Sequence, residues 1–239
     1  MKHSVLLFLA LVFFPCAAYG QKAEGRTCRI IFLERPASAP ATMHLFDGVT
    51  SREVDLPDMS LSKVYDLRSG KLPLALLTAP LGDPKELPPG APSVIVPENA
   101  TDIYLLVMSD PANKVAPVRL EVVDAGGAKL RRGQTLWFNL TQFKVGGTLG
   151  SEKFVIKPLS RALMDAPRND RGDYPVSLGY LMEGNKQLYP ICESRWSHDP
   201  RSRNLGFVID RGGIKSPLVM LFPDFRSEPE KPSKRASQP

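Results

Sequence analysis

Short apolar or alternating runs, separated by brief polar breaks, recur along the chain from residue 28 onward. Turn-forming residues separate them at roughly the 8–12-residue spacing that is typical of antiparallel sandwiches. Since each run has the length of a strand, the pattern predicts a mostly β protein. The predicted strands are Cys28–Glu34, Met43–Asp47, Ser51–Leu56, Lys63–Leu67, Leu72–Thr78, Ser93–Val96, Asp102–Ser109, Val118–Asp124, Gln134–Leu140, Lys153–Lys157, Val176–Met182, Gln187–Arg195, Leu205–Asp210 and Pro217–Phe222.

Two kinds of interruption lie between these runs. Asp47-Gly48 predicts a hairpin turn, and so do the glycine pairs Gly126-Gly127, Gly146-Gly147 and Gly212-Gly213. No helix follows any glycine pair, so a phosphate-binding loop is not predicted. Leu159–Asp165 has helix-forming residues and predicts a single helical turn.

The number of runs favours an antiparallel β-sandwich fold, as two Ig-like sandwich units packed together. The alternative is one large sandwich. The best junction is the proline-containing segment Ser109–Pro117. The expected organisation is a signal peptide at residues 1–20, one sandwich domain at 21–112, a second at 113–225 and a disordered tail at 226–239.

The first 20 residues have the pattern of a secretory signal peptide. Lys2 precedes the apolar run Val5–Phe14, which is too short to span a bilayer, and Ala18-Tyr19-Gly20 offers a small-residue cleavage site. We therefore expect cleavage before Gln21 and export to the periplasm or the extracellular space. No other run approaches the length of a membrane helix, so no transmembrane segment is expected in the mature chain.

Composition narrows the class of protein further. The 239 residues include 23 prolines, 43% hydrophobic and 23% charged residues, which indicates a globular, loop-rich chain rather than a helical one. The net charge of +6 falls to +5 when Lys2 is removed, and part of the remainder lies on the tail. The high isoelectric point is therefore only weak support for an anionic partner.

Two cysteines remain after cleavage, Cys28 and Cys192. In an oxidising compartment they are candidates for a disulfide that joins an early strand to a late one, and two separate thiols are the alternative. No catalytic or metal-binding set is predicted, because the mature chain has only His44 and His198 and no nucleophile motif. No cofactor is predicted either.

Two groups of polar residues are candidate sites. Carboxylates crowd the first domain, where a catalytic pair is conceivable but solvated strand faces are the commoner outcome. A basic and aromatic segment near the C-terminus is a candidate for binding an anion or a partner. The carboxylates are Asp47, Glu53, Asp55, Asp58 and Asp66, and the basic and aromatic residues are Arg195, Trp196, Arg201, Arg203, Arg211 and Lys215.

Several segments resemble uncharacterised exported proteins of Verrucomicrobia-type bacteria. They are TDIYLLVMSDPANKVAPVRLEVVD, GQTLWFNLTQFKVGGTLG, LYPICESRWSHDPRSR and LFPDFR. This resemblance implies export and a β fold, and it implies no activity. The segment GQTLWFNLTQF is also similar in style to a strand of periplasmic pilus chaperones, although the chain has no clear counterpart of that family's anchoring Arg and Lys pair.

The preferred interpretation is a non-catalytic protein with a binding or structural role at the cell envelope, whose partner is an envelope protein or an anionic polymer and not nucleic acid. A first alternative is a chaperone-like module that pairs a sheet edge with a partner strand, and it requires an unpaired apolar edge beside a basic cleft. A second alternative is a hydrolase of an envelope polymer, and it requires two carboxylates that face each other in a groove.

Overall fold

A computed structural model describes residues 25–36, 39–127, 129–182, 184–185, 187–211 and 216–226. This part holds sixteen strands and one short 3-10 helix, η1 (Pro84–Glu86), which lies in a proline-rich loop. The predicted signal peptide, the Gly212-Gly213 turn, Lys215 and the tail beyond Arg226 lie outside the described residues. Within them, no helix is long and apolar enough to cross a membrane.

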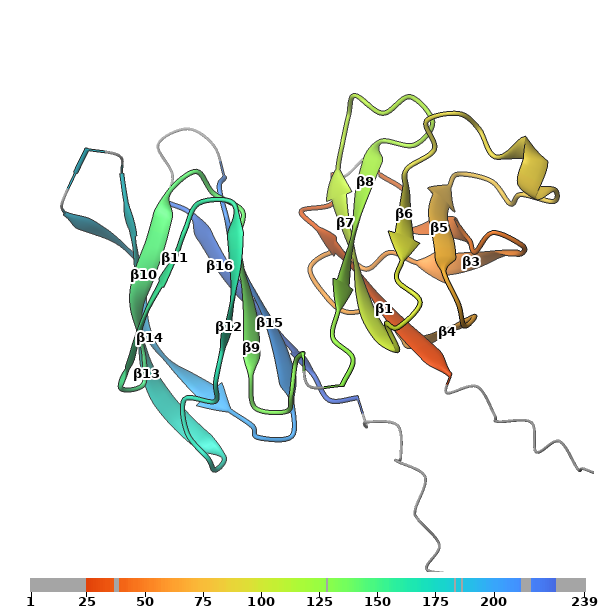
Figure 1. The fold of residues 1–239 in the computed structure, drawn as a ribbon. Helices are drawn as coiled ribbons and strands as arrows, with labels where there is room; N and C mark the ends of the chain where they lie inside the picture. The colour runs from red at the N-terminus through yellow and green to blue at the C-terminus, as the bar shows by residue number, and fades with distance from the viewer. Residues whose placement is uncertain are drawn as a thin grey trace, which may run out of the picture.

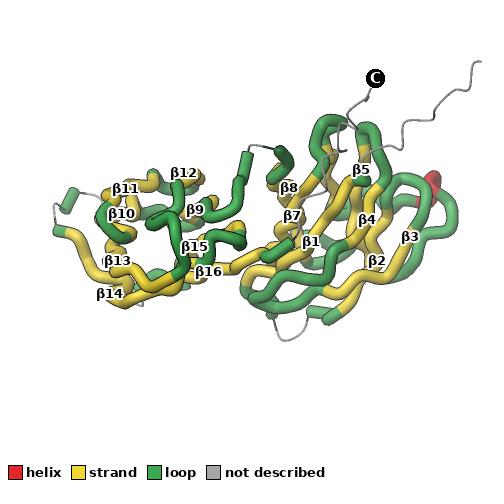
Figure 2. The backbone as a smooth tube through the Cα atoms, turned by 90° about the horizontal axis from the view of Figure 1, so that it is seen from below, coloured by secondary structure: helices red, strands yellow, loops and turns green. Residues whose placement is uncertain are grey.

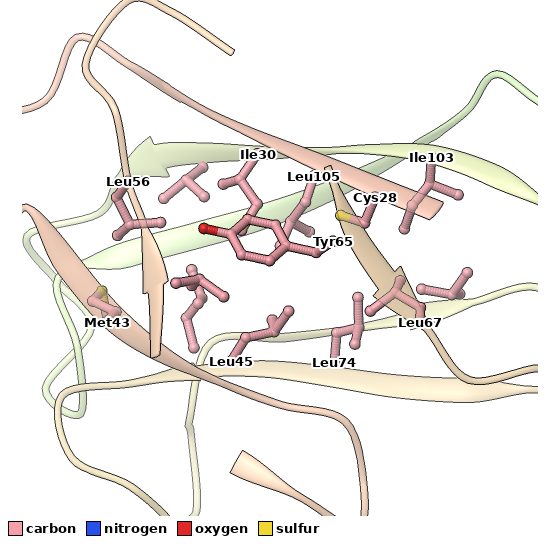
Figure 3. Close-up of a cluster of buried hydrophobic side chains, with 14 of the residues drawn as sticks. Cys28, Ile30, Met43, Leu45, Leu56, Tyr65, Leu67, Leu74, Ile103 and Leu105 are labelled. Carbon is pink, nitrogen blue, oxygen red and sulfur yellow. The ribbon is translucent and has the colours of Figure 1, made fainter. Parts of the chain in front are cut away.

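The first eight strands form one β-sandwich of two four-stranded sheets. Its apolar core lies between the sheets and includes Cys28, Ile30, Leu45, Leu74 and Leu105 (Figure 3). In spatial order, one sheet is β4 (Tyr65–Leu67), β1 (Arg26–Leu33), β7 (Asp102–Ser109) and β8 (Val118–Asp124), and the other is β3 (Ser51–Asp55), β2 (Thr42–Phe46), β5 (Leu72–Leu77) and β6 (Ser93–Val96).

The last eight strands form a second sandwich of the same size. Its core is built around Trp137, Val145, Ile156 and Leu178. In spatial order, one sheet is β12 (Ser160–Met164), β9 (Thr135–Asn139), β15 (Arg203–Ile209) and β16 (Leu218–Asp224), and the other is β11 (Glu152–Ile156), β10 (Lys144–Leu149), β13 (Gly172–Leu181) and β14 (Leu188–His198).

The two sandwiches repeat one strand order. Counted within each unit, the sheets run 4-1-7-8 and 3-2-5-6. In both units the first and seventh strands pair in parallel, and the other pairings are antiparallel. The chain shows no sequence repeat of fixed period, so this duplication is visible only in the topology. The prediction of an all-β protein made of two packed sandwich units is confirmed.

Equivalent sheets of the two units pack face to face, which gives four layers in all (Figures 1 and 2). A third apolar cluster lies between the inner layers and contains Leu106 and Met108 of β7 together with Phe138, Phe207 and Phe222 of the second sandwich. Strands β7 and β15 are therefore covered on both faces. This explains why their sequences are nearly continuous apolar runs instead of alternating ones.

Four predictions about local structure need correction. Gly126-Gly127 lies in the connection between the two sandwiches and not in a hairpin turn, because β8 and β9 belong to different sheets. The segment Ser109–Pro117 is a hairpin loop inside the first sandwich and not a domain junction, because β8 pairs with β7. The junction lies after Asp124. Leu159–Asp165 contains β12 and not a helical turn, since pairing with β9 outweighs its helix-forming composition. Gly146-Gly147 lies inside β10, where a Cβ on Gly147 would stand 1.8 Å from the Ser177 carbonyl oxygen.

The predicted disulfide is also not formed. Cys28 lies in the core of the first sandwich, whereas Cys192 is half-buried against the core of the second, and both thiols are free. Two intervening sheets separate these cores, so the thiols cannot meet.

Thiol labelling can check this arrangement in a chain that carries Cys16→Ser. Denatured, unreduced protein should react at both Cys28 and Cys192. In the native protein only Cys192 should react readily, because burial raises the pKa of the Cys28 thiol to about 12 and keeps it protonated. If neither cysteine were labelled after denaturation, the result would show that Cys28 and Cys192 form a disulfide after all.

Glycine at position 206 is required by the core of the second sandwich. A Cβ there would lie 2.5 Å from Cε3 of the buried Trp137 ring. We expect Gly206→Ala to lower the free energy of unfolding by about 1–3 kcal/mol through overpacking, measured by urea denaturation. Gly82→Ala is the matched control, since a Cβ at Gly82 meets nothing within 4 Å. If the two variants were equally stable, position 206 would not be packed tightly against the Trp137 ring.

Candidate functional site

A groove of about 720 Å³ opens at the junction of the two sandwiches. One wall comes from the edge strands β6 and β8 of the first sandwich, and the other comes from β9 and β12 of the second (Figure 1). The groove residues are Val94, Ile95, Pro97, Asn99, Leu120, Glu121, Val122, Asp124, Lys129, Leu136 and Arg161.

The groove runs along the backbone edge of β8. Three consecutive residues, Leu120, Glu121 and Val122, line it. Consecutive side chains of a strand point to opposite faces of the sheet, so a cavity above one face would touch only alternate residues. Contact with all three means that the groove meets the edge of the strand, where backbone groups are accessible.

The hydrogen-bond pattern shows which peptide groups face the groove. Asp110 N–H donates to the Pro117 carbonyl at 2.9 Å, and Ala125 N–H donates to the Asp102 carbonyl at 2.8 Å, at opposite ends of the β7–β8 ladder. In an antiparallel pair, residues that bond to the partner strand alternate with residues that face away. With the observed register, Glu121 bonds to β7, and the N–H and C=O groups of Leu120 and Val122 face away from it.

Strand β12 extends beyond the edge at β8. Arg161 pairs with Phe138 and Leu163 pairs with Leu136, so both side chains lie on the face of that sheet which packs against the first sandwich. Phe138 is buried there, whereas Leu163 remains 46% exposed. The layer that contains β8 therefore ends before it covers β12.

The charges in the groove are unevenly paired. Lys129 forms an ion pair with Asp124, whose carboxylate also accepts the Gly126 N–H at 3.0 Å. Arg161 is exposed and has no ion-pair partner among the described residues. Glu121 and Asp124 are three residues apart on β8 and so point to opposite faces of the sheet. These two carboxylates do not face each other.

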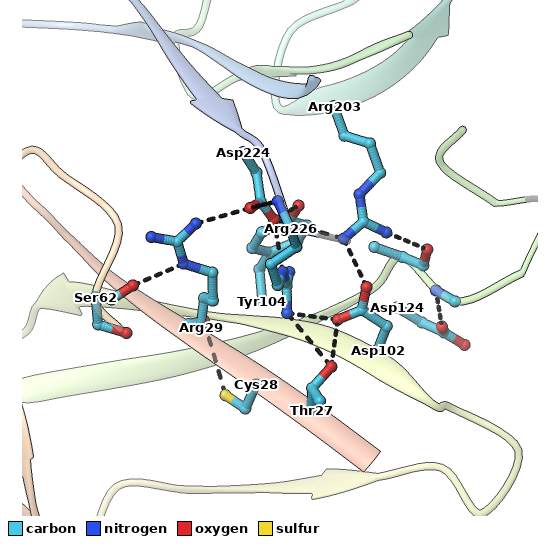
Figure 4. A network of polar contacts seen from close by, with 12 residues as sticks. Thr27, Cys28, Arg29, Ser62, Asp102, Tyr104, Asp124, Arg203, Asp224 and Arg226 are labelled. Carbon is cyan, nitrogen blue, oxygen red and sulfur yellow. Dashed lines mark hydrogen bonds and ion pairs between the residues drawn. The ribbon is translucent and has the colours of Figure 1, made fainter. Parts of the chain in front are cut away.

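A buried polar network fixes the junction at one end of the interface (Figure 4). Asp224 of β16 is fully buried and lies 2.7 Å from Arg29 Nη1 and 2.7 Å from Arg226 Nε, and it accepts the Tyr104 hydroxyl at 2.5 Å. Asp102 of β7 lies 2.6 Å from Arg203 Nη2 and 2.5 Å from Arg226 Nη1. Asp102 thus binds two arginines of the second unit, whereas Asp224 binds Arg29 of the first unit and Arg226 of its own.

This network also positions the groove. Arg203 Nη1 donates to the carbonyl of Ala125 at 3.3 Å, immediately after β8. The Arg226 guanidinium lies 4.7 Å from the centre of the Tyr104 ring, a cation–π contact. Burial raises the pKa of the Asp224 carboxyl, but Arg226 and the Tyr104 hydroxyl outweigh that effect and hold it at about 2. Asp224 is therefore ionised at neutral pH.

The predicted basic and aromatic residues do not form one surface. Arg203 is buried in the network, and Trp196 stacks on Trp137 with ring centres 6.1 Å apart. Arg201 pairs with Asp199 at 2.7 Å, and that guanidinium holds the pKa of Asp199 well below its usual range. Arg195 and Arg211 are exposed, on β14 and after β15, respectively.

The other polar candidates show no shared centre. Asp55 contacts Lys63 at 3.1 Å and Tyr65 Oη at 3.2 Å, on an exposed face. His198 is buried at the end of β14, where burial lowers its pKa and Nε2 has no hydrogen-bond partner. In the described ranges, no three His, Cys, Asp or Glu side chains come close enough together to hold a metal ion.

Sequence reasoning missed most of the groove. Leu120, Val122 and Val94 were assigned to strands, but the apolar pattern that predicts these strands does not identify β8 and β6 as edges. Arg161 lay in the segment that was expected to be helical. The signal that could have indicated the groove is the charge pattern of β8, VRLEVVD, since charged residues are common on edge strands.

Comparison with known proteins gives no family for this chain. No protein-family model matches it, and no curated protein is similar to it in sequence.

Proposed function

We propose that the chain is an exported, non-catalytic binding protein of the cell envelope that receives its ligand in the groove between the two sandwiches. The observation that carries the proposal is this groove, whose walls come from both units and which ends at unpaired edge strands. Export is supported by the pattern of Met1–Gly20.

The rigid junction supports a binding role. Inter-domain contacts usually permit relative motion unless the interface is large and apolar. Here the apolar cluster and the Asp102–Arg203 and Asp224–Arg29 pairs join the units. Both walls of the groove are consequently held in place before a ligand arrives, which reduces the entropic cost of binding.

Of the two alternatives, the strand-pairing module gains support from β8, because the peptide groups of Leu120 and Val122 face the groove. The hydrolase gains none from this site, since Glu121 and Asp124 point to opposite faces and Asp124 is paired with Lys129. We therefore do not propose hydrolysis in the groove.

Site-specific photo-crosslinking in the cells that produce the protein tests the proposal. A crosslinking amino acid at Ile95 or Asn99, both in the groove, should give defined adducts. The same group at Val64, an exposed position outside the groove, serves as the control. Equal adduct patterns from all three positions would refute a binding role for the groove. Mass spectrometry of the mature protein should find Gln21 at its N-terminus.

A further inference from the structure

We propose that the groove binds an extended segment of a partner polypeptide, which adds to β8 as a fifth strand of its sheet. One face of this segment is apolar, and the other carries at least one carboxylate. The inference rests on the proposed binding function and names the chemistry of its ligand.

The first argument is the geometry of the exposed backbone. The outward peptide groups of Leu120 and Val122 offer donors and acceptors two residues apart along an extended chain. Neither residue has a backbone partner among the described residues. An added polypeptide strand satisfies this pattern with its own peptide groups, at the usual separation of about 4.8 Å between strands.

The second argument is the environment that an added strand would meet. One row of its side chains would face Val94, which is only half-buried against the core of the first sandwich. The other row would face β12, where Arg161 lines the groove and has no ion-pair partner in the described part of the chain. Because side chains alternate along a strand, the ligand needs an apolar row and a row with carboxylate near Arg161.

A second copy of this chain fits the edge less well. Two identical strands that pair antiparallel are related by a twofold axis perpendicular to the sheet. Both second sandwiches would then lie on the same side of the combined sheet, and both β12 strands extend beyond β8 on that side. They would compete for one position, so we commit to a segment of another protein.

Fluorescence anisotropy with two labelled nine-residue peptides tests the inference on the purified chain. One peptide alternates valine with glutamate, and the other alternates valine with lysine. The glutamate peptide should bind saturably, and at least tenfold more tightly than the lysine peptide. No saturable binding of the glutamate peptide, or equal binding of the two, would overturn the proposal.

Two substitutions examine the two arguments separately. Leu120→Pro removes an outward N–H, which an edge strand tolerates, and should weaken binding at least tenfold. Arg119→Ala, on the same strand but outside the groove lining, should change binding less than twofold. If binding to Leu120→Pro equals binding to the unmodified chain, β8 is not the docking edge.

Charge reversal at position 161 should reverse the preference between the two peptides, and an unfolded variant would not give that result. Arg161→Glu should lose at least tenfold in affinity for the glutamate peptide and gain affinity for the lysine peptide, whereas Arg161→Lys should keep the original preference. A preference that does not reverse would overturn the role of Arg161. Concentration-dependent dimerisation that Leu120→Pro abolishes would assign the edge to a second copy and overturn the proposal.

The two levels of the hypothesis can fail separately. Groove-specific crosslinks without peptide binding would leave the binding function in place and reject the strand ligand. Absence of groove-specific crosslinks would reject the binding function itself.

Discussion

Replacing Asp224 with asparagine is expected to lower the free energy of unfolding by about 3–5 kcal/mol at pH 7. The carboxylate is fully buried and paired with Arg29 and Arg226. Asparagine keeps the shape but removes the negative charge, so the Arg29 guanidinium loses its counter-ion and Arg226 keeps only Asp102. Urea denaturation of the variant and the unmodified chain measures the loss. Asp170→Asn is the control, because its pair with Arg168 is exposed and such pairs contribute about 1 kcal/mol or less.

The same substitution should change how stability depends on pH. The pKa of Asp224 is about 2 in the folded protein, compared with an ordinary value of 3.8. A group with a lowered folded pKa stabilises the protein above its unfolded pKa, and this contribution disappears as pH falls from about 5 towards 2. The unmodified chain should therefore lose more stability than Asp224→Asn across this interval. Parallel pH profiles would show that Asp224 does not contribute through its charge.

Most strands could be predicted from the sequence because burial produces a simple pattern. Strands β6, β7 and β8 have the predicted bounds, since turn residues flank short apolar or alternating runs. The two missed strands lack that pattern. Strand β10 contains Gly146-Gly147, where close approach of β13 excludes a side chain, and β12 is built from helix-forming residues that pair with β9.

The predictions about particular site residues failed where they depended on contacts between distant segments. Arg203 was expected at a basic surface, but Asp102 and Asp224 neutralise it inside the junction. Cys28 and Cys192 were expected to meet, although they lie in different cores. The groove depends on which strands end each sheet, and local sequence does not determine that order.

The apolar contact between the sandwiches makes the two units interdependent. Phe207 is fully buried there, stacks on Phe138 with ring centres 5.0 Å apart and contacts Phe222 edge to face at 5.7 Å. The buried residues of this interface form a cluster separate from both sandwich cores. Removing the interface contact should therefore not unfold either sandwich directly. It should instead uncouple them, and the groove would lose its fixed width.

Phe207→Ala should therefore lower the free energy of unfolding by about 3–5 kcal/mol and broaden or split a single calorimetric transition. Truncation leaves a cavity between two sheets whose other contacts hold them in position, so collapse is incomplete. Phe225→Ala is the matched control, since the same atoms are removed from a side chain that is 54% exposed, and it should cost less than about 1 kcal/mol. If both variants unfold in one transition of unchanged midpoint, the sandwiches do not depend on Phe207 for their coupling. The groove would then have to be held by the polar network alone.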